Sequence, residues 1–256
     1  MKALILYFSG TGNTKYVAKL IDSEMRTLGL STKLHSIEEA FSIQPDTYDF
    51  LVLGCPKYYE RPVFYFIDYL KKNLPKSKNT VPAMIFCTQA GPLNTDFKGL
   101  EKMLAKKNHR IIAEESITLA NNLLFFGTFK PTDPEKINEA TENARQLVKP
   151  LVAAFVSGKG NKQSLNPFLV ASEQLVAVLC TKFMPVFAMK YSTSSDCIGC
   201  GLCAKKCPKQ NITMREHRPV FGKQCIFCTR CVNICPANAI LYHNKKCPQY
   251  KLIEKI

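Results

Sequence analysis

Short runs of apolar residues alternate with longer segments of helical period over residues 1–150 of the chain. Three of the runs are almost entirely apolar, which is typical of strands that are covered on both faces, and a weaker, alternating run suits an edge strand. The expected strands span residues 3–8, 32–37, 48–54, 81–87 and 111–119.

Between these strands, apolar residues recur at the spacing of an amphipathic helix. One such stripe spans 17–28 and is followed by Gly29, a residue type that often ends helices, and a second stripe spans 97–104. Asp133 followed by Pro134 predicts the N-cap and the first residue of a long third helix. Five strands alternating with helices predict an α/β fold with a doubly wound parallel sheet.

A small, polar segment at 157–164 marks a boundary, and the apolar stretch after it contains Glu173, Lys182 and Pro185. We therefore expect a buried inter-domain helix there and no membrane span. The N-terminus lacks a secretory cleavage site, so we expect a cytoplasmic protein. The expected division is a large domain at 1–156, a linker with an apolar helix at 157–195 and a small domain at 196–256.

Eight of the twelve cysteines lie in an internal repeat near the C-terminus. CIGCGLCAKKCPKQNI at 197–212 and CIFCTRCVNICPANAI at 225–240 share every Cys, the Pro and two Ile positions. The duplication predicts two equivalent sites related by a pseudo-twofold axis.

Each repeat has the spacing C-x2-C-x2-C-x3-C-P, which is that of bacterial iron–sulfur clusters. Three closely spaced thiolates reach three corners of one cubane, and the fourth Cys, at the start of a helix, points to the other cluster. A zinc site would need two well-separated pairs of ligands instead. Residues 196–242 thus resemble the two-cluster ferredoxin domain, with α+β structure. The expected ligands are Cys197, Cys200, Cys203 and Cys235 for one [4Fe–4S] cluster, and Cys225, Cys228, Cys231 and Cys207 for the other.

The remaining cysteines, Cys55, Cys87, Cys180 and Cys247, are expected to be small buried hydrophobic residues. The four His residues are scattered, and none adjoins a cysteine or carboxylate motif, so we assign no catalytic residue.

The first expected strand runs directly into the loop Ser9-Gly10-Thr11-Gly12-Asn13-Thr14, and a helix follows. Backbone N–H groups and the positive helix end at such a loop bind phosphate. The Walker sequence requires Gly-Lys-Ser/Thr, and the dinucleotide fingerprint requires a third Gly where Lys15 stands, so neither fits. The loop resembles the flavodoxin pattern that grips the phosphate of FMN.

That resemblance covers about 1–150 and implies a five-stranded sheet of order 2-1-3-4-5, with FMN at the carboxyl ends of its strands. It also implies two further FMN loops, in which Tyr58 or Tyr59 stacks on the ring. Glu60 stands where relatives often carry Gly. The loops comprise Pro56, Lys57, Tyr58 and Tyr59 after the third strand, and Thr88, Gln89, Ala90 and Gly91 after the fourth.

The whole chain resembles the flavodoxin–ferredoxin fusion proteins of anaerobes. This resemblance implies low-potential electron transfer between FMN and two [4Fe–4S] clusters, with ferredoxin, flavodoxin or a redox enzyme as partner. The alternative is an FMN-dependent reductase of a quinone or enone, with 165–190 and 121–129 over its pocket, so the enzyme status stays open.

The sequence carries 35 Lys and Arg against 20 Asp and Glu, a formal net charge of +15. Two clusters and a flavin phosphate lower this charge to about +9. About half of the excess falls within 196–256, so we expect this domain to dock an acidic redox protein. Nucleic acid is not an expected partner, because the sequence lacks basic–aromatic motifs.

Overall fold

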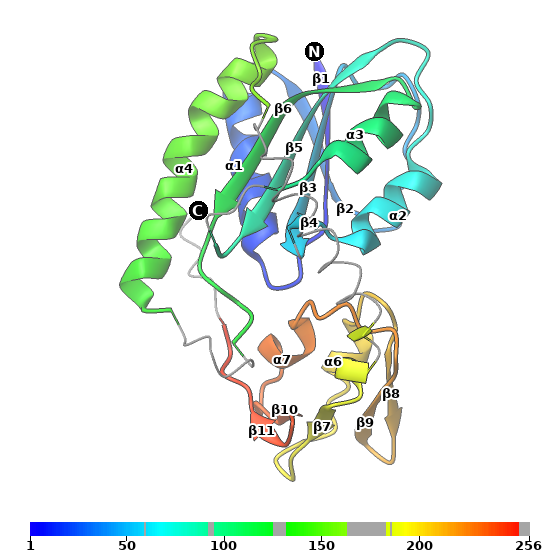
Figure 1. Cartoon of the computed structure of the whole chain (residues 1–256), viewed down its shortest axis with the longest axis vertical. Coiled ribbons are helices and arrows are strands. Elements are labelled where there is room, and N and C mark those ends of the chain that lie inside the picture. The colour runs from blue at the N-terminus through cyan, green and yellow to red at the C-terminus, as the bar shows by residue number, and fades with distance from the viewer. Residues whose placement is uncertain (59, 92–94, 125–131, 163–182, 185, 251–256) are drawn as a thin grey trace.

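The computed structural model describes residues 1–58, 60–91, 95–124, 132–162, 183–184 and 186–250. Figure 1 shows a large N-terminal domain above a small C-terminal domain. The small domain lies at the edge of the large one where the parallel strands end (Figure 1). This is the edge at which open α/β sheets bind their ligands.

The large domain is built on one sheet whose five long strands are parallel. Their order is β2-β1-β3-β5-β6. Because β5 and β6 are the fourth and fifth long strands, this is the predicted order 2-1-3-4-5, and the predicted fold class is confirmed. A two-residue strand, β4, pairs antiparallel with the end of β3 and was not predicted. The bounds are β1 Lys2–Tyr7, β2 Ser31–Ser36, β3 Phe50–Tyr58, β4 Arg61–Pro62, β5 Val81–Gln89 and β6 His109–Thr118.

Helices of the described residues cover both faces of this sheet (Figure 1). The helices α1 (Asn13–Thr27) and α4 (Pro134–Val156) pack on one face, and α2 (Phe64–Asn73) and α3 (Lys98–Ala105) pack on the other. The sequence pattern did not predict α2, which starts with aromatic residues of low helix propensity. Burial of Phe66 and Leu70 stabilises it in place of propensity.

Two of the predicted helix ends follow from local chemistry. The Oδ1 atom of Asp133 accepts a hydrogen bond from the backbone N–H of Glu135 at 3.0 Å, so Asp133 is the N-cap of α4. After α1, Leu28 takes the C-cap position and Gly29 follows it with φ 82°. A left-handed backbone at this position favours glycine.

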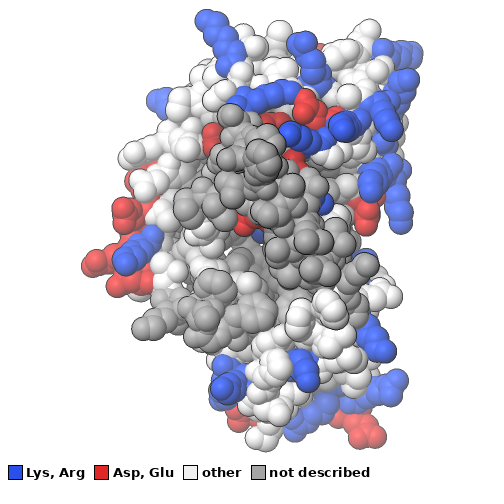
Figure 2. Space-filling view, viewed as in Figure 1, with Lys and Arg blue, Asp and Glu red and all other residues white. Residues whose placement is uncertain are grey.

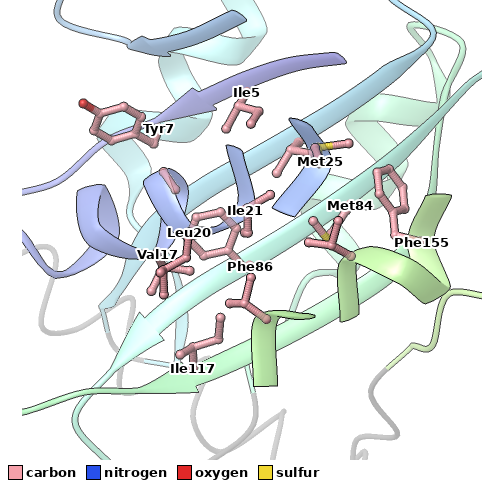
Figure 3. Packing of buried hydrophobic residues seen from close by; sticks show 14 of the residues in the cluster. Ile5, Tyr7, Val17, Leu20, Ile21, Met25, Met84, Phe86, Ile117 and Phe155 are labelled. Atoms are coloured by element: carbon pink, nitrogen blue, oxygen red, sulfur yellow. The ribbon is translucent and has the colours of Figure 1, made fainter. Parts of the chain in front are cut away.

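Each face of the sheet has its own apolar core. Figure 3 shows one of them, where Ile5 and Met84 of the sheet meet Val17 and Ile21 of α1 and Phe155 of α4. The core on the other face contains the side chains of Phe8, Cys55 and Cys87, close to the carboxyl ends of the strands. The strands are therefore held on both sides, as continuous apolar runs require.

As far as it is described, the small domain consists of short strands and the one-turn helices α6 and α7. Its β7 pairs antiparallel with β10 and lies before the expected boundary at residue 196. The Tyr191 ring packs at 5.6 Å from Phe221 and 5.1 Å from Tyr242, between centroids. The bounds are β7 Tyr191–Thr193, α6 Leu202–Lys205, β8 Ile212–Arg215, β9 Arg218–Phe221, α7 Arg230–Asn233, β10 Ile240–Tyr242 and β11 Lys245–Lys246.

The sequence repeat is also a repeat of backbone conformation. Left-handed residues recur at equivalent places in the two halves of the small domain. The first half uses Gly at two of these places, whereas the second half uses larger residues despite their steric cost. The pairs are Gly199 (φ 69°) and Phe227 (φ 53°), Gly201 (φ 71°) and Thr229 (φ 54°), and Gln210 (φ 49°) and Asn238 (φ 44°).

Among the described residues, no helix has the length and apolar character that crossing a membrane requires. The apolar segment 165–190 lies mostly outside the described residues, which include only 183–184 and 186–190 of it. In the view of Figure 2, Lys and Arg side chains gather at both ends of the molecule, and Asp and Glu gather along α4.

Candidate redox site

The loop from Ser9 to Thr14 joins β1 to α1 at the carboxyl edge of the sheet. Gly12 is the N-cap of α1 with φ 114°, a conformation that L side chains rarely adopt. The helix has no side-chain cap and no acidic residue in its first turn. Its first N–H groups and its positive end are therefore left for an anion.

The hydroxyl groups of this loop are fixed by neighbours. Gly12 N–H donates to Ser9 Oγ at 3.1 Å, and the amide Nδ2 of Asn122 donates to Thr11 Oγ1. Because both oxygens act as acceptors, their own O–H groups remain to donate to a phosphate. Thr14 Oγ1 instead lies 2.7 Å from Thr88 Oγ1, and this buried pair ties the loop to the end of β5. The loop thus fits a phosphate through backbone N–H groups and two hydroxyls.

Pro56, Lys57 and Tyr58 lie at the end of β3, beside the phosphate loop. Burial, with the nearby Cys228 and Cys225, raises the pKa of Tyr58 well above its usual value, so this phenol is neutral. Glu60 has φ 57°, which explains why a Gly would suit this place. Its carboxylate pairs with the Lys57 ammonium across the turn. Tyr59, the other predicted stacking residue, lies outside the described residues.

The third predicted loop starts at the end of β5. Thr88 and Gln89 are buried, whereas Ala90 is exposed and Gly91 is partly exposed. The Gln89 side chain donates from Nε2 to Thr118 Oγ1 at 3.3 Å, toward β6. Ala90 and Gly91 thus form the more exposed end of the part of this loop that the structure describes.

The predicted ligands of the first cluster surround one cavity in the small domain. This cavity is lined by Cys197, Cys200, Cys203 and Cys235. The first three come from one repeat and the fourth from the other, as the spacing predicts.

The predicted ligands of the second cluster surround another cavity. It is lined by Cys207, Cys225, Cys228 and Cys231. In the part of the chain that the structure describes, no three metal-binding side chains converge closely enough to hold a single ion. The thiols instead line two cavities, four to each, and this donor set fits a cubane that carries one thiolate at each iron.

Backbone N–H groups point at several of these sulfurs. The N–H of Asn211 donates to Cys207 Sγ and that of Ala239 donates to Cys235 Sγ, both at 3.3 Å, so the two repeats are equivalent here as well. Burial raises the pKa of the Cys228 thiol to about 12. Bound iron would replace the proton, and N–H donors to sulfur influence the potential of such sites.

The second cavity faces the large domain. A Cβ added to Gly10 of the phosphate loop would lie 2.6 Å from the carbonyl oxygen of Cys228. The Tyr65 hydroxyl of α2 donates to the carbonyl of Pro208 at 3.1 Å. The first cavity is lined by Cys200, whose side chain is exposed. The structure thus places one set of four cysteines beside the phosphate loop, whereas the other set includes an exposed cysteine.

Two protein-family models match separate parts of the chain. Residues 196–239 match the model of a 4Fe-4S dicluster domain, and residues 4–113 match the model of a flavodoxin domain. The chain therefore joins a flavodoxin domain to a two-cluster ferredoxin domain. FMN and [4Fe–4S] clusters are its cofactors, and electron transfer is its general role.

Several solved structures resemble part of the chain at low sequence identity. An archaeal flavodoxin is 14% identical, with 61% of this chain and 99% of that chain covered and a TM-score of 0.44. A mutant flavodoxin from Pseudomonas aeruginosa is 12% identical over the same shares, with a TM-score of 0.42. Rubredoxin oxygen:oxidoreductase from Desulfovibrio gigas is 15% identical over 61% of this chain and 36% of that chain, with a TM-score of 0.39. Curated protein sequences give no match.

Sequence reasoning missed the residues that join the two domains. Arg230 and Tyr250 of the ferredoxin domain contact the phosphate loop, and Asn122 supports it from the loop after β6. The only sequence signal was the position of Arg230 inside the second cysteine repeat. The alternative reductase function placed the segment 121–129 over a pocket, and residues 125–129 of this segment lie outside the described residues.

Proposed function

We propose that this protein passes electrons between FMN and an external redox protein by way of its two clusters. The observation that carries this proposal is the contact between Gly10 of the phosphate loop and Cys228 of the second cluster loop. FMN exchanges two electrons, singly if required, and each cluster exchanges one. A protein with both cofactors at one domain contact can couple two-electron to one-electron carriers.

The two cysteine sets have different roles in this proposal. The inner site, with Cys225, Cys228, Cys231 and Cys207, is the flavin-side site. The outer site, with Cys197, Cys200, Cys203 and Cys235, is the partner-side site. Support for this order comes from the exposed Cys200 and from Ile198, which is 69% exposed beside the outer cavity.

An acidic ferredoxin, flavodoxin or reductase is the proposed partner. Residues 196–256 contain eleven Lys and Arg against three Asp and Glu, and Lys205 is exposed close to the outer cysteines. Complementary charge increases the rate of encounter more than it increases affinity. The partner is therefore expected to dock over the outer cavity, with Ile198 and Leu202 as its apolar contacts.

The cofactor ligands remain those that the sequence predicts. We propose that the flavodoxin domain ends at about 156 and, because β7 pairs with β10, that the ferredoxin domain begins at about 191 rather than at the expected 196. We also propose that the protein works in the cytoplasm, where thiols stay reduced. The residues that we propose to hold FMN are Ser9, Gly10, Thr11, Gly12, Asn13, Thr14, Pro56, Lys57, Tyr58, Tyr59, Thr88, Gln89, Ala90 and Gly91.

Cofactor analysis tests the basis of the proposal. Protein that is purified without oxygen is expected to contain about eight iron atoms, eight sulfides and one FMN. A protein with zinc in place of iron, or without bound flavin, would overturn the electron-relay function.

Stopped-flow mixing with a reduced acidic ferredoxin tests the partner. We expect Lys205→Glu to lower the second-order rate constant several-fold at low salt, and we expect high salt to remove the difference. Lys149→Glu on α4 is the matched control, because Lys149 is exposed on the flavodoxin domain. Equal effects of the two variants would contradict docking at the outer site. Rapid reoxidation of the flavin by a quinone or enone would favour the reductase alternative.

A further inference from the structure

The guanidinium group of Arg230 joins the second cluster loop to the flavodoxin domain. Its Nε donates to the carbonyl of Gly10 at 3.1 Å, and its Nη2 donates to the carbonyl of Ser9 at 2.7 Å. Its Nη1 donates to the carbonyl of Lys206 at 3.0 Å. Both terminal nitrogens also bind the carboxylate of Glu38, at 2.7 and 2.6 Å. All five N–H groups of the side chain are thus used.

This arrangement is specific for arginine and is shielded from solvent. Only 16% of the Arg230 side chain and 23% of the Glu38 side chain are exposed. The guanidinium also lies 5.8 Å from the centre of the Phe8 ring. A lysine would keep the charge but has only three donors and no planar fork, so it cannot reproduce this set of bonds.

The bonds to Ser9 and Gly10 fix the direction of two peptide units in the phosphate loop. In a trans peptide the N–H group points opposite to the carbonyl group of the same unit. When Arg230 holds the carbonyls of Ser9 and Gly10 toward the ferredoxin domain, the N–H groups of Gly10 and Thr11 are turned the other way. A cation at the carbonyl side also polarises these units and strengthens their N–H groups as donors.

Arg230 connects this loop to the inner cysteine site through the chain itself. It lies between Cys228 and Cys231, and Lys206, whose carbonyl it binds, precedes Cys207. A change in the inner cysteine loop therefore changes the position of the guanidinium group, and with it the phosphate loop.

We propose that Arg230 is a positioning residue for FMN. The affinity of the protein for FMN then depends on the cysteine loop around Arg230, which must contact the flavodoxin domain and hold its cluster. This inference rests on the proposed function, which places the FMN phosphate at this loop. The flavodoxin domain alone then has an incompletely fixed phosphate site, and the ferredoxin domain completes it.

The test is titration of FMN into the flavin-free full chain with its clusters in place, followed by quenching of flavin fluorescence. Arg230→Gln is expected to weaken binding about tenfold or more, because it removes charge-assisted hydrogen bonds to the loop. Arg230→Lys is expected to fall between this variant and the wild type. Arg218→Gln is the matched control, because Arg218 also donates to a backbone carbonyl, that of Ser194, but within the ferredoxin domain.

A second variant keeps the inference testable if Arg230→Gln does not fold. Glu38→Gln keeps the arginine but removes the charged acceptor that holds both of its terminal nitrogens, so the guanidinium group is held less firmly against Ser9 and Gly10. We expect a smaller, several-fold loss of FMN affinity. Removal of the inner cluster by Cys231→Ala should also weaken FMN binding, whereas Cys200→Ala at the outer site should not.

The outcomes separate this inference from the proposed function. Wild-type affinity in Arg230→Gln and in Glu38→Gln, with normal iron content, would overturn the positioning role alone. A wild-type chain that does not bind FMN at all would overturn the proposed function.

Discussion

The thiol groups of Cys55 and Cys87 lie 3.7 Å apart, on in-register positions of β3 and β5. Both residues are fully buried in the apolar core below the flavin-side loops. Burial raises the pKa of the Cys87 thiol well above its usual value, and the hydrogen bond to Cys55 raises it further. A thiol rather than a thiolate is therefore present at neutral pH, and thiols are poor nucleophiles.

We expect both cysteines to resist alkylation while the protein is folded. Iodoacetamide at mildly alkaline pH, followed by mass spectrometry of peptides, should label them only after the chain is unfolded in urea. The exposed Cys200 of protein without clusters serves as the reactive control. Rapid labelling of Cys87 in the folded protein would show that this core opens.

Gly54 leaves room for the Phe86 ring in the packed core of the flavodoxin domain. A Cβ at this position would lie 2.2 Å from the Phe86 ring. Gly54→Ala should destabilise the protein by about 1–3 kcal/mol, because the ring must move in a packed interior. Gly99→Ala in α3 is the control, since nothing lies within 4 Å of the added atom. The control should leave stability unchanged or increase it by about 0.5–1 kcal/mol, measured as a shift in the urea midpoint.

His109 gives the flavodoxin domain a pH-dependent stability. Its Nε2 lies 2.9 Å from the Tyr48 hydroxyl and 3.3 Å from Ser77 Oγ, and burial lowers its pKa to about 4. The unfolded chain binds a proton at this residue near pH 6.5, whereas the folded chain does so only near pH 4. Stability is therefore complete above about pH 6.5 and falls as the pH decreases toward 4, with a loss of about 2 kcal/mol between pH 7.5 and pH 5.

Urea midpoints at about pH 7.5 and pH 5 measure this loss. His109→Gln should have a smaller difference between the two pH values, since it removes one titrating group. The same pH dependence in the variant and the wild type would assign the loss to other groups. His217, which is exposed, provides the matched substitution.

Tyr250 provides a second tie between the ferredoxin domain and the phosphate loop. Its hydroxyl donates to Asn13 Oδ1 at 2.7 Å, and Asn13 Nδ2 donates to the carbonyl of Ala120 at 3.1 Å. Tyr250→Phe leaves the Asn13 oxygen buried without this donor, which should cost about 1–2 kcal/mol. We expect a lower urea midpoint and a few-fold weaker FMN binding. Tyr69→Phe on α2 is the control, and an equal effect of both variants would contradict a local tie.

The strands were predictable because parallel strands that are buried on both faces form continuous apolar runs. Their ends were less so. The expected strand 48–54 continues to Tyr58 as β3, and 81–87 continues to Gln89 as β5, because main-chain pairing extends through polar residues such as Thr88. Main-chain hydrogen bonds do not depend on side-chain polarity, so the hydrophobic pattern cannot show where they stop.

The grouping of the cysteines was predictable from spacing within two short repeats. The contacts between the domains were not, because they join residues that are far apart in sequence. Arg230 binds Gly10 across 220 positions, and Tyr250 binds Asn13 across 237. Neither contact leaves a periodic or local signal, so only the folded arrangement reveals it.

The unequal use of glycine in the two halves of the small domain has a consequence for how the duplication is used. Where the first half has Gly201, the second half has Thr229, whose hydroxyl donates to the carbonyl of Asn122 at 3.5 Å. The Thr229 residue is only 3% exposed. Where the first half has Gly199, the second half has Phe227, whose ring centroid lies 5.8 Å from that of Tyr191. The second half thus has strained backbone at Phe227 and Thr229, and in return the side chains of these two residues anchor it. An exchange of the two halves by recombination would put glycines at the domain contact. The resulting chain should keep both sets of cysteine ligands, but its ferredoxin domain should no longer be held in one orientation against the flavodoxin domain.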